Sequence, residues 1–170
     1  MKIRAIRAHL NLSIGGMLMK KISEAVICVA MVFSVLGAAN AQFAKPEDAI
    51  KYRKAVMFLI AQHFKRMGAV VQGKAEYEKG RFSKDAEAVK VLATLPWEAM
   101  LEPGTDKGDT TLSEAVFKVP EKFKEAAKTF EEANVKLADL ASEGDFEGIK
   151  GQFGAVAGSC KSCHSQFRSK

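Results

Sequence analysis

Apolar residues recur every three or four positions along most of the chain after residue 45, which is the spacing of one face of an α-helix. The first such segment opens with residues 46–48 (PED), where proline costs no hydrogen bond and the two acids favour the positive end of a helix. This pattern predicts a helix from Pro46 to about Gly73. Its apolar positions are Ile50, Met57, Ile60, Phe64 and Met67.

The middle of the chain predicts a second helix followed by a loop. Ser83 is placed to cap this helix, and Pro96 is placed to end it. Residues 103–109 (PGTDKGD) have the composition of a loop, and residues 111–114 (TLSE) match the capping-box pattern that begins a short helical turn. The apolar positions of the second helix are Val89, Leu92 and Leu95.

Two longer helices complete the pattern. Pro120 can open the third helix, Gly144 can close it, and the fourth runs from Asp145. No segment alternates with period two for long enough to predict a strand. The sequence therefore predicts an all-α fold, an antiparallel up-down-up-down four-helix bundle. The seam positions are Phe123, Phe130 and Leu137 in the third helix, and Phe146, Ile149, Phe153, Val156, Cys160, Cys163 and Phe167 in the fourth.

The first 41 residues predict a signal peptide rather than a part of the fold. Basic residues at 20 and 21 precede a mostly apolar run at 22–38, and residues 39–41 (ANA) form a cleavage site with small residues. The apolar run is short for a membrane span, so removal is favoured over a retained anchor. The exported domain is expected to start at Gln42.

Removing 41 of the 170 residues leaves 129, residues 42–170, which is enough for one domain. Five basic residues and one acidic residue leave with the signal, so the formal net charge falls from +6 to +2. The basic character of the full chain therefore does not indicate nucleic-acid binding. Translation from Met1, Met17 or Met19 would give the same domain.

The most specific chemical motif is CKSCH, residues 160–164, on the last predicted helix. Cys160 and Cys163 lie one turn apart on one side of a helix, so each thiol can add to one vinyl group of a haem. His164 follows directly and can bind the iron as an axial ligand. The motif predicts one covalently attached haem c per chain, at one end of the bundle.

Two other uses of these cysteines are less well supported. A zinc site needs four ligands in separated pairs, and the sequence has no second CxxC pair. A redox dithiol of the thioredoxin type expects a strand-rich context, which the pattern of apolar residues does not predict.

These features together resemble the class II c-type cytochromes, and within that class cytochrome c′. The export signal, the helical pattern and the position of CxxCH close to the C-terminus carry the resemblance. Further segments that resemble this family are QFAKPEDAIKYRK (42–54), LPW (95–97), PGT (103–105) and CKSCHSQFR (160–168).

The resemblance implies roles for five more residues. Arg53 falls at the family's basic position beside a haem propionate, and Met57, one turn later, falls at the position that covers the distal face of the iron. Arg168 falls on the proximal side, one turn beyond the haem histidine. Lys54 and Asp109 are expected at the propionate edge.

Met57 leaves two functions open. An unligated Met57 gives a high-spin, five-coordinate iron that binds nitric oxide and carbon monoxide, whereas a thioether bound as sixth ligand gives a low-spin electron carrier. The pair Tyr52-Arg53 favours the five-coordinate alternative. His63 points about 240° round the helix from Met57, so a bis-histidine iron is not predicted.

Other residues of the predicted helices favour a binding protein over an enzyme. A peroxidase needs a distal acid or base, and neither a histidine nor a carboxylate shares the face of Met57. Trp97 is expected to pack against the haem edge or in the core, and Met67 and Met100 in the core.

The expected location is the periplasm, with no stable membrane anchor after the signal is removed. The expected partners are nitric oxide, carbon monoxide, a redox partner that the sequence does not identify, and a second copy of the chain. The homodimer is inferred from the family and from Val56, Phe58 and Leu59, which lie off the haem-facing stripe.

Overall fold

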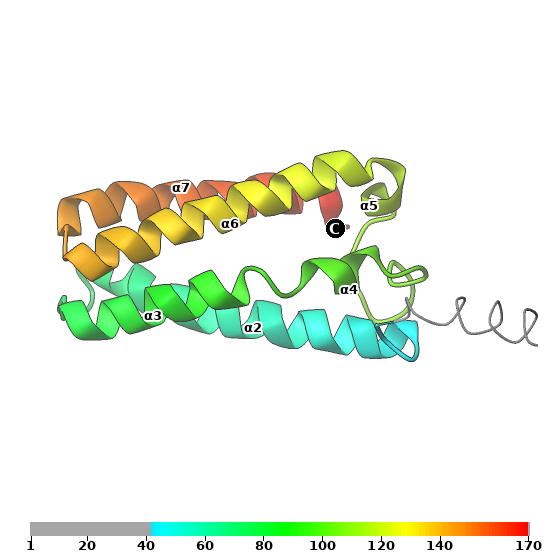
Figure 1. Ribbon diagram of the computed structural model, residues 1–170, viewed down its shortest axis with the longest axis horizontal. Helices are drawn as coiled ribbons and strands as arrows, with labels where there is room; N and C mark the ends of the chain where they lie inside the picture. Colours follow the sequence, from blue (N-terminus) through cyan, green and yellow to red (C-terminus); the bar gives the residue numbers. More distant parts are fainter. Residues whose placement is uncertain (1–41, 170) are drawn as a thin grey trace, which may run out of the picture. The chain divides into compact units, whose positions relative to one another are not determined.

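The apolar repeats of the sequence become four long antiparallel helices (Figure 1). The computed structural model describes residues 42–169, so the predicted signal peptide at 1–41 lies outside the described residues. The long helices are α2 (Pro46–Val71), α3 (Lys79–Leu92), α6 (Pro120–Glu143) and α7 (Phe146–Phe167). They run up, down, up and down, with α2 packed on α3, α3 on α6 and α6 on α7.

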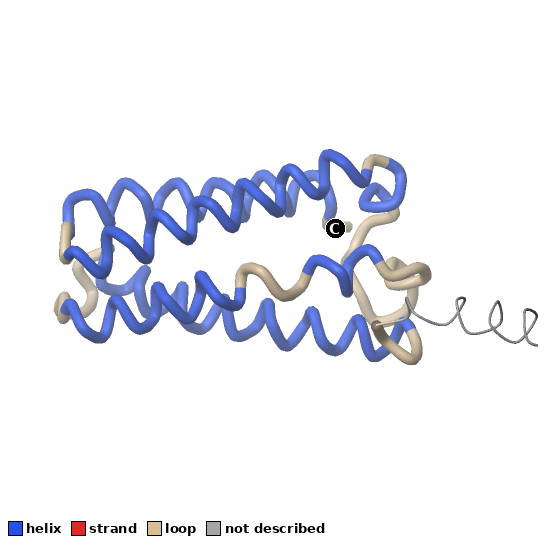
Figure 2. Tube along the Cα trace, in the orientation of Figure 1, coloured by secondary structure: helices blue, strands red, loops and turns tan. Residues whose placement is uncertain are grey.

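Two short helices, α4 (Trp97–Leu101) and α5 (Ala115–Lys118), lie at the end of the bundle where the chain crosses from α3 to α6 (Figure 1). Between residues 42 and 169 there is no strand, and the one bridge of the β type pairs Leu112 with Arg168 (Figure 2). None of the helices in this range is both long and apolar enough to cross a membrane. The all-α bundle predicted from the sequence is confirmed.

Most helix ends follow the predicted signals. Pro46 and Pro120 occupy the first turns of α2 and α6. The Asp145 carboxylate caps α7 by accepting a hydrogen bond from the Gly148 amide at 3.0 Å. Gly144 ends α6 with a φ of 84°, a left-handed conformation that glycine adopts without steric strain.

The predicted start of the second helix was wrong. The helix begins at Lys79, because the Glu78 carboxylate accepts hydrogen bonds from the amides of Gly80 and Arg81 at 2.8 and 2.7 Å. Ser83 lies inside the helix and donates to the carbonyl of Ala141 at 2.6 Å. That carbonyl belongs to the last turn of α6, where no helical amide is available, so the serine joins two helices instead of capping one.

The capping box predicted at residues 111–114 also does not form. The short helix α5 starts at Ala115, whose amide donates to Ser113 Oγ at 3.2 Å. Thr111 is held by the C-terminal segment, since its carbonyl accepts from the Ser169 amide at 2.8 Å. A long-range pairing therefore replaces the local motif.

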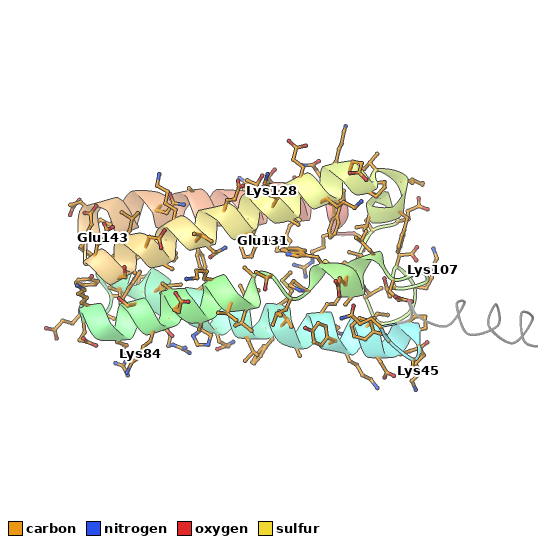
Figure 3. The ribbon with its side chains drawn as sticks, viewed as in Figure 1. Lys45, Lys84, Lys107, Lys128, Glu131 and Glu143 are labelled. Atoms are coloured by element: carbon orange, nitrogen blue, oxygen red, sulfur yellow. The ribbon has the colours of Figure 1, made fainter. Side chains whose placement is uncertain are left out.

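The bundle interior is mostly apolar along all four long helices, although Asn134 of α6 is also buried. Charged side chains such as Lys84 and Lys128 point outward (Figure 3). The predicted outer position of Val56 was wrong: it is 5% exposed, because it lies one turn from Ile60 on the face that packs in the core. Phe58 and Leu59 are exposed, at 61% and 44%. The main core consists of Val56, Ile60, Met67, Phe82, Ala86, Val89, Ala93, Phe130, Leu137, Ala138, Ala141, Ile149 and Val156.

A polar cluster joins α2 to α3 outside this core. The Asp85 carboxylate, on a side chain that is 12% exposed, lies 2.7 Å from His63 Nδ1 and 2.6 Å from Arg66 Nη2. Burial disfavours the charged carboxylate, but hydrogen bonds from Arg66 and His63 outweigh it and hold the pKa of Asp85 below its usual value. The half-buried His63 thus stabilises a helix pair and lies away from Met57.

We expect Asp85→Asn to lower the free energy of unfolding at pH 7 by about 1–3 kcal/mol, because Arg66 and His63 lose their buried anionic partner. The folded-state pKa of Asp85 is depressed, so its contribution is fully present above the unfolded pKa of about 3.9 and is lost as the pH falls through the folded value. Urea unfolding of the haem-loaded protein at several pH values measures both effects. The matched control is Asp139→Asn, an exposed position on α6. Equal stability of the two variants at pH 7 would contradict the assignment.

Candidate functional site

The described chain has a cavity of about 1140 Å³. Its lining residues include members of α4, which lies with α5 and the end of α7 at one end of the bundle (Figure 1). Its walls are mostly apolar and come from α2, α4, α6, α7 and the loop before α5. This volume and this lining are typical of a site for a small molecule or cofactor. Its residues include Arg53, Lys54, Met57, Phe58, Ile60, Ala61, Phe64, Trp97, Met100, Asp109, Thr110, Thr111, Leu112, Phe123, Phe130, Cys160, Cys163, His164 and Arg168.

The CxxCH motif lies on the last two turns of α7 and faces this cavity. Cys160 and Cys163 are free, half-buried thiols, three residues apart on one face of the helix. Burial raises the pKa of both thiols, and the neighbouring Cys163 adds to the shift of Cys160. Protonated thiols that share one apolar wall can add to two sites on one bound molecule.

His164 follows the second thiol and lines the same cavity. Burial of the ring, with a smaller contribution from the positive charge of Arg168, lowers the pKa of His164 below its ordinary value. This shift favours the neutral imidazole, which is the form that binds a metal ion.

Helix α2 supplies a second wall. Met57 and Ala61 are one turn apart and both line the cavity, as does Ile60. Met57 is half-buried and packs against the main core. The structure thus brings Met57 to the same cavity as Cys160, Cys163 and His164, although more than 100 residues separate them in the sequence.

Arg53 lies one turn before Met57 and is 4% exposed. Its guanidinium donates to the carbonyl of Ala99 at 3.0 Å, to the carbonyl of Thr105, and to Thr110 Oγ1 at 2.6 Å. Burial lowers the pKa of Arg53, while the negative charge of Asp106 opposes that shift. Arg53 therefore fixes the loop that forms one wall of the cavity, a role that the sequence analysis missed.

Lys54 and Asp109 meet at the rim of the cavity. Lys54 Nζ lies 2.7 Å from Asp109 Oδ2 and donates to the Asp109 carbonyl at 3.3 Å. The hydrogen bond from Lys54 lowers the pKa of Asp109. Both side chains are exposed, so the pair marks the solvent edge of the cavity, and their place beside the haem propionates stays a prediction.

Trp97 packs beside the cavity, with its ring edge-on against Phe123 and Phe130. Its Nε1–H is buried without a protein acceptor within the described chain. Buried donors normally have a partner, so this indole N–H is an exception among the buried polar groups of residues 42–169.

The side chains present suit a haem. Two thiols and one imidazole line a mostly apolar cavity, and Arg53 and Lys54 bring positive charge to its edge. Within residues 42–169, no three His, Cys, Asp or Glu side chains gather to hold a metal ion by themselves.

Sequence reasoning missed the residues that shape the site without a motif. Thr105, Thr110 and Thr111 lie in or beside the loop, and Thr105 is fully buried. Their partners are distant in the sequence: Arg53 is 57 residues from Thr110, and Arg168 is 57 residues from Thr111. No local pattern could have indicated these contacts.

A four-helix bundle with a CxxCH motif on its last helix, facing an apolar cavity, is typical of the class II c-type cytochromes. The family model described as "Cytochrome C'" matches residues 48–168. The chain belongs to the cytochrome c′ family. Membership of this family implies a covalently bound c-type haem.

Individual relatives agree with this assignment. Cytochrome c' from Rubrivivax gelatinosus is 42% identical over 130 residues, which cover 76% of this chain and 100% of the relative. Among solved structures, the nitric oxide complex of a leucine-to-alanine variant of cytochrome c prime from Alcaligenes xylosoxidans has a TM-score of 0.71 at 40% identity, and covers 76% of this chain and 99% of that chain. A carbon monoxide-bound leucine-to-glycine variant of the same protein also has a TM-score of 0.71 at 40% identity, covering 76% of this chain and 100% of that chain.

We expect Arg53→Met to destabilise the folded protein by about 2 kcal/mol, because methionine keeps the packing of the side-chain stem but leaves the carbonyls of Ala99 and Thr105 without a donor. Urea unfolding measures the loss. Lys54→Met, at the next position, removes only the exposed pair with Asp109 and should leave the unfolding midpoint close to that of the parent. If the two variants unfold at the same urea concentration, Arg53 does not hold the loop.

Proposed function

We propose that this chain is a periplasmic cytochrome of the c′ type that carries one haem c, bound through Cys160 and Cys163 and ligated by His164. Its function is to bind nitric oxide and carbon monoxide and to transfer electrons. The observation that carries the proposal is the single apolar cavity shared by the CxxCH residues and Met57.

The haem supplies a redox-active iron, and the side chains of this chain decide what reaches it. Met57, Ile60 and Ala61 line the α2 side of the cavity, and none of their side chains has an N–H or O–H donor. Dioxygen gains more from a polar distal group than nitric oxide or carbon monoxide does. The part of the α2 wall formed by Met57, Ile60 and Ala61 therefore favours the latter two gases. Variants of one relative, cytochrome c prime from Alcaligenes xylosoxidans, have been solved with nitric oxide and with carbon monoxide, which supports binding of these two gases.

Met57 acts here by packing, which leaves the iron five-coordinate and high-spin. Its side chain is half-buried against the core, and packing is the usual role of a methionine in such a position. The alternative is that the Met57 sulfur binds the iron and the protein is a low-spin electron carrier. The buried guanidinium of Arg53, one turn away, supports the first choice through the family resemblance.

The α2 wall also favours a binding protein over an enzyme. Its cavity-lining residues are Arg53, Lys54, Met57, Phe58, Ile60, Ala61 and Phe64, with no histidine or carboxylate among them. A peroxidase needs such a group to move a proton at the bound oxygen atoms.

Export and dimer formation complete the proposal. Residues 1–41 serve as a cleaved signal peptide, since haem c is attached outside the cytoplasmic membrane in such proteins. The exposed apolar side chains Tyr52, Phe58 and Leu59 of α2 support a homodimer through this helix.

The attachment is tested by Cys160→Ala and Cys163→Ala. We expect the parent protein, matured with the apparatus for c-type haem, to keep its haem when precipitated with acidified acetone. Each single variant should retain one thioether, and the absorption bands of the reduced pyridine haemochrome should shift accordingly. Cys28→Ala, which lies in the predicted signal, is the matched control and should behave as the parent. Loss of all colour from the parent into the acetone would contradict the proposal.

Met57→Leu distinguishes the two coordination states. We expect the ferric and ferrous absorption spectra of this variant to remain those of the parent, because a packing residue of similar volume does not change the ligands of the iron. The reduced parent and the variant should both show a spectral change with excess nitric oxide. Disappearance of a methionine-to-iron charge-transfer band in the variant would instead assign Met57 as sixth ligand. An unchanged ferrous spectrum under nitric oxide would exclude the gas-binding function.

A further inference from the structure

Two stacked aromatic rings, here called the aromatic stack, join α2 to α7 beside the cavity. The rings of Phe64 on α2 and Phe153 on α7 have 4.1 Å between their centroids and 7° between their planes. Both side chains pack against the main core, but only Phe64 is among the residues that line the cavity. The ring of Phe153 therefore supports a ring that forms part of the cavity wall.

Phe64 lies deeper in the bundle than Met57. The cavity-lining positions Met57, Ile60, Ala61 and Phe64 follow the i, i+3, i+4, i+7 spacing of one helix face. At 1.5 Å per residue, Phe64 is about 10 Å further along α2 than Met57, away from the helix start at Pro46. A ligand that extends along this face from Met57 into the bundle therefore meets Phe64.

Phe153 also packs against a glycine of α2. Gly68, one turn after Phe64, is buried, and a Cβ atom at this position would lie 3.2 Å from Phe153 Cζ and 3.8 Å from Phe153 Cε1. The first distance is shorter than the about 3.5–4.0 Å of a favourable contact between carbon atoms. Any larger residue at position 68 therefore has to displace the ring of Phe153.

A displacement of Phe153 is transmitted to the cavity. The ring is packed in the core and stacked on Phe64, so it has little free space of its own. Phe64 borders the cavity, and it is the neighbour that can yield. The residue at position 68 thus determines, through Phe153, how far the ring of Phe64 reaches into the site.

We propose that the aromatic stack, seated on Gly68, limits the length of the ligands that the Met57 side of the site accepts. Gly68 is a positioning residue that acts through Phe153 and Phe64. The inference deepens the proposed function and rests on it, because it takes the bound gas to lie beside Met57. Diatomic gases fit in front of Phe64, whereas longer apolar ligands that bind ferrous iron through a terminal carbon atom reach its ring.

The first arm of the test needs no ligand. Haem-loaded parent, Gly68→Ala and Gly151→Ala proteins are unfolded in urea. Gly151 is exposed on α7, and a Cβ atom there would meet no side chain or other helix of the described chain within 4 Å. We expect Gly151→Ala to raise the unfolding midpoint, because alanine restricts the unfolded chain more than glycine does. Gly68→Ala should give no rise or a fall, because the contact with Phe153 offsets that gain.

The second arm compares two ligands of different length. The reduced parent and variants are titrated with carbon monoxide and with n-butyl isocyanide, and binding is followed by absorption. We expect the ratio of the isocyanide Kd to the carbon monoxide Kd to rise about three- to tenfold in Gly68→Ala, because a misfit of one methylene in an apolar pocket costs about tenfold or more and this displacement is smaller. Gly151→Ala should keep the ratio of the parent.

Variants of the two rings test the route. Leucine at position 153 removes the ring that transmits the displacement, so Gly68→Ala should have no effect on the ratio in a Phe153→Leu background. Phe64→Leu shortens the wall directly and should lower the ratio. If the parent binds carbon monoxide but no isocyanide, Phe64→Leu should bind both. Urea unfolding of the same proteins checks that each variant is folded.

The outcomes separate the two proposals. The role of the aromatic stack is overturned by an equal rise of the midpoint in Gly68→Ala and Gly151→Ala, by an unchanged ligand ratio in Gly68→Ala, or by a rise that persists in the Phe153→Leu background. Each of these results leaves the proposed function intact. A parent protein that shows no spectral change with carbon monoxide or nitric oxide overturns the proposed function and this inference with it.

Discussion

The hydrogen bonds of one buried cation, Arg53, determine how the open end of this bundle is built. Four helices packed along an apolar seam need no polar contact to associate, but the loop between α4 and α5 has few apolar residues to hold it. The Arg53 guanidinium supplies donors to two loop carbonyls and one hydroxyl. The loop held in this way lines one wall of the cavity that Met57 and the CxxCH residues also line.

The four-helix bundle could be predicted from the sequence because the signals that start and end its helices are local. Prolines at the first turns of α2 and α6, Asp145 at the start of α7 and the seven-residue repeats act within one or two helical turns. The same holds for the CxxCH motif, whose geometry is that of a single turn. Local signals also gave two wrong predictions of helix caps. Ser83 and residues 111–114 have side chains suited to capping, but they bind partners that are distant in the sequence.

The walls of the cavity could be predicted only in part. Family resemblance placed Met57, Arg53 and Arg168 around the site, and the structure brings all three to one cavity with the CxxCH residues. What Arg53 and Arg168 bind could not be read from the sequence, because threonines and backbone carbonyls more than 40 residues away are their partners. Whether Val56 is buried or exposed likewise depends on how α2 is rotated about its axis against α3. The sequence of one helix does not specify that rotation.

The loop before α5 is joined to the end of the helix that carries the CxxCH motif, through the Leu112–Arg168 bridge and the backbone hydrogen bonds of Thr111 and Ser113. Loss of residues 167–169 would leave the two thiols and the histidine in place but would remove the partners of this loop. The C-terminal end of α7 therefore serves the site twice, by carrying the CxxCH motif and by holding a loop that lines another wall of the cavity.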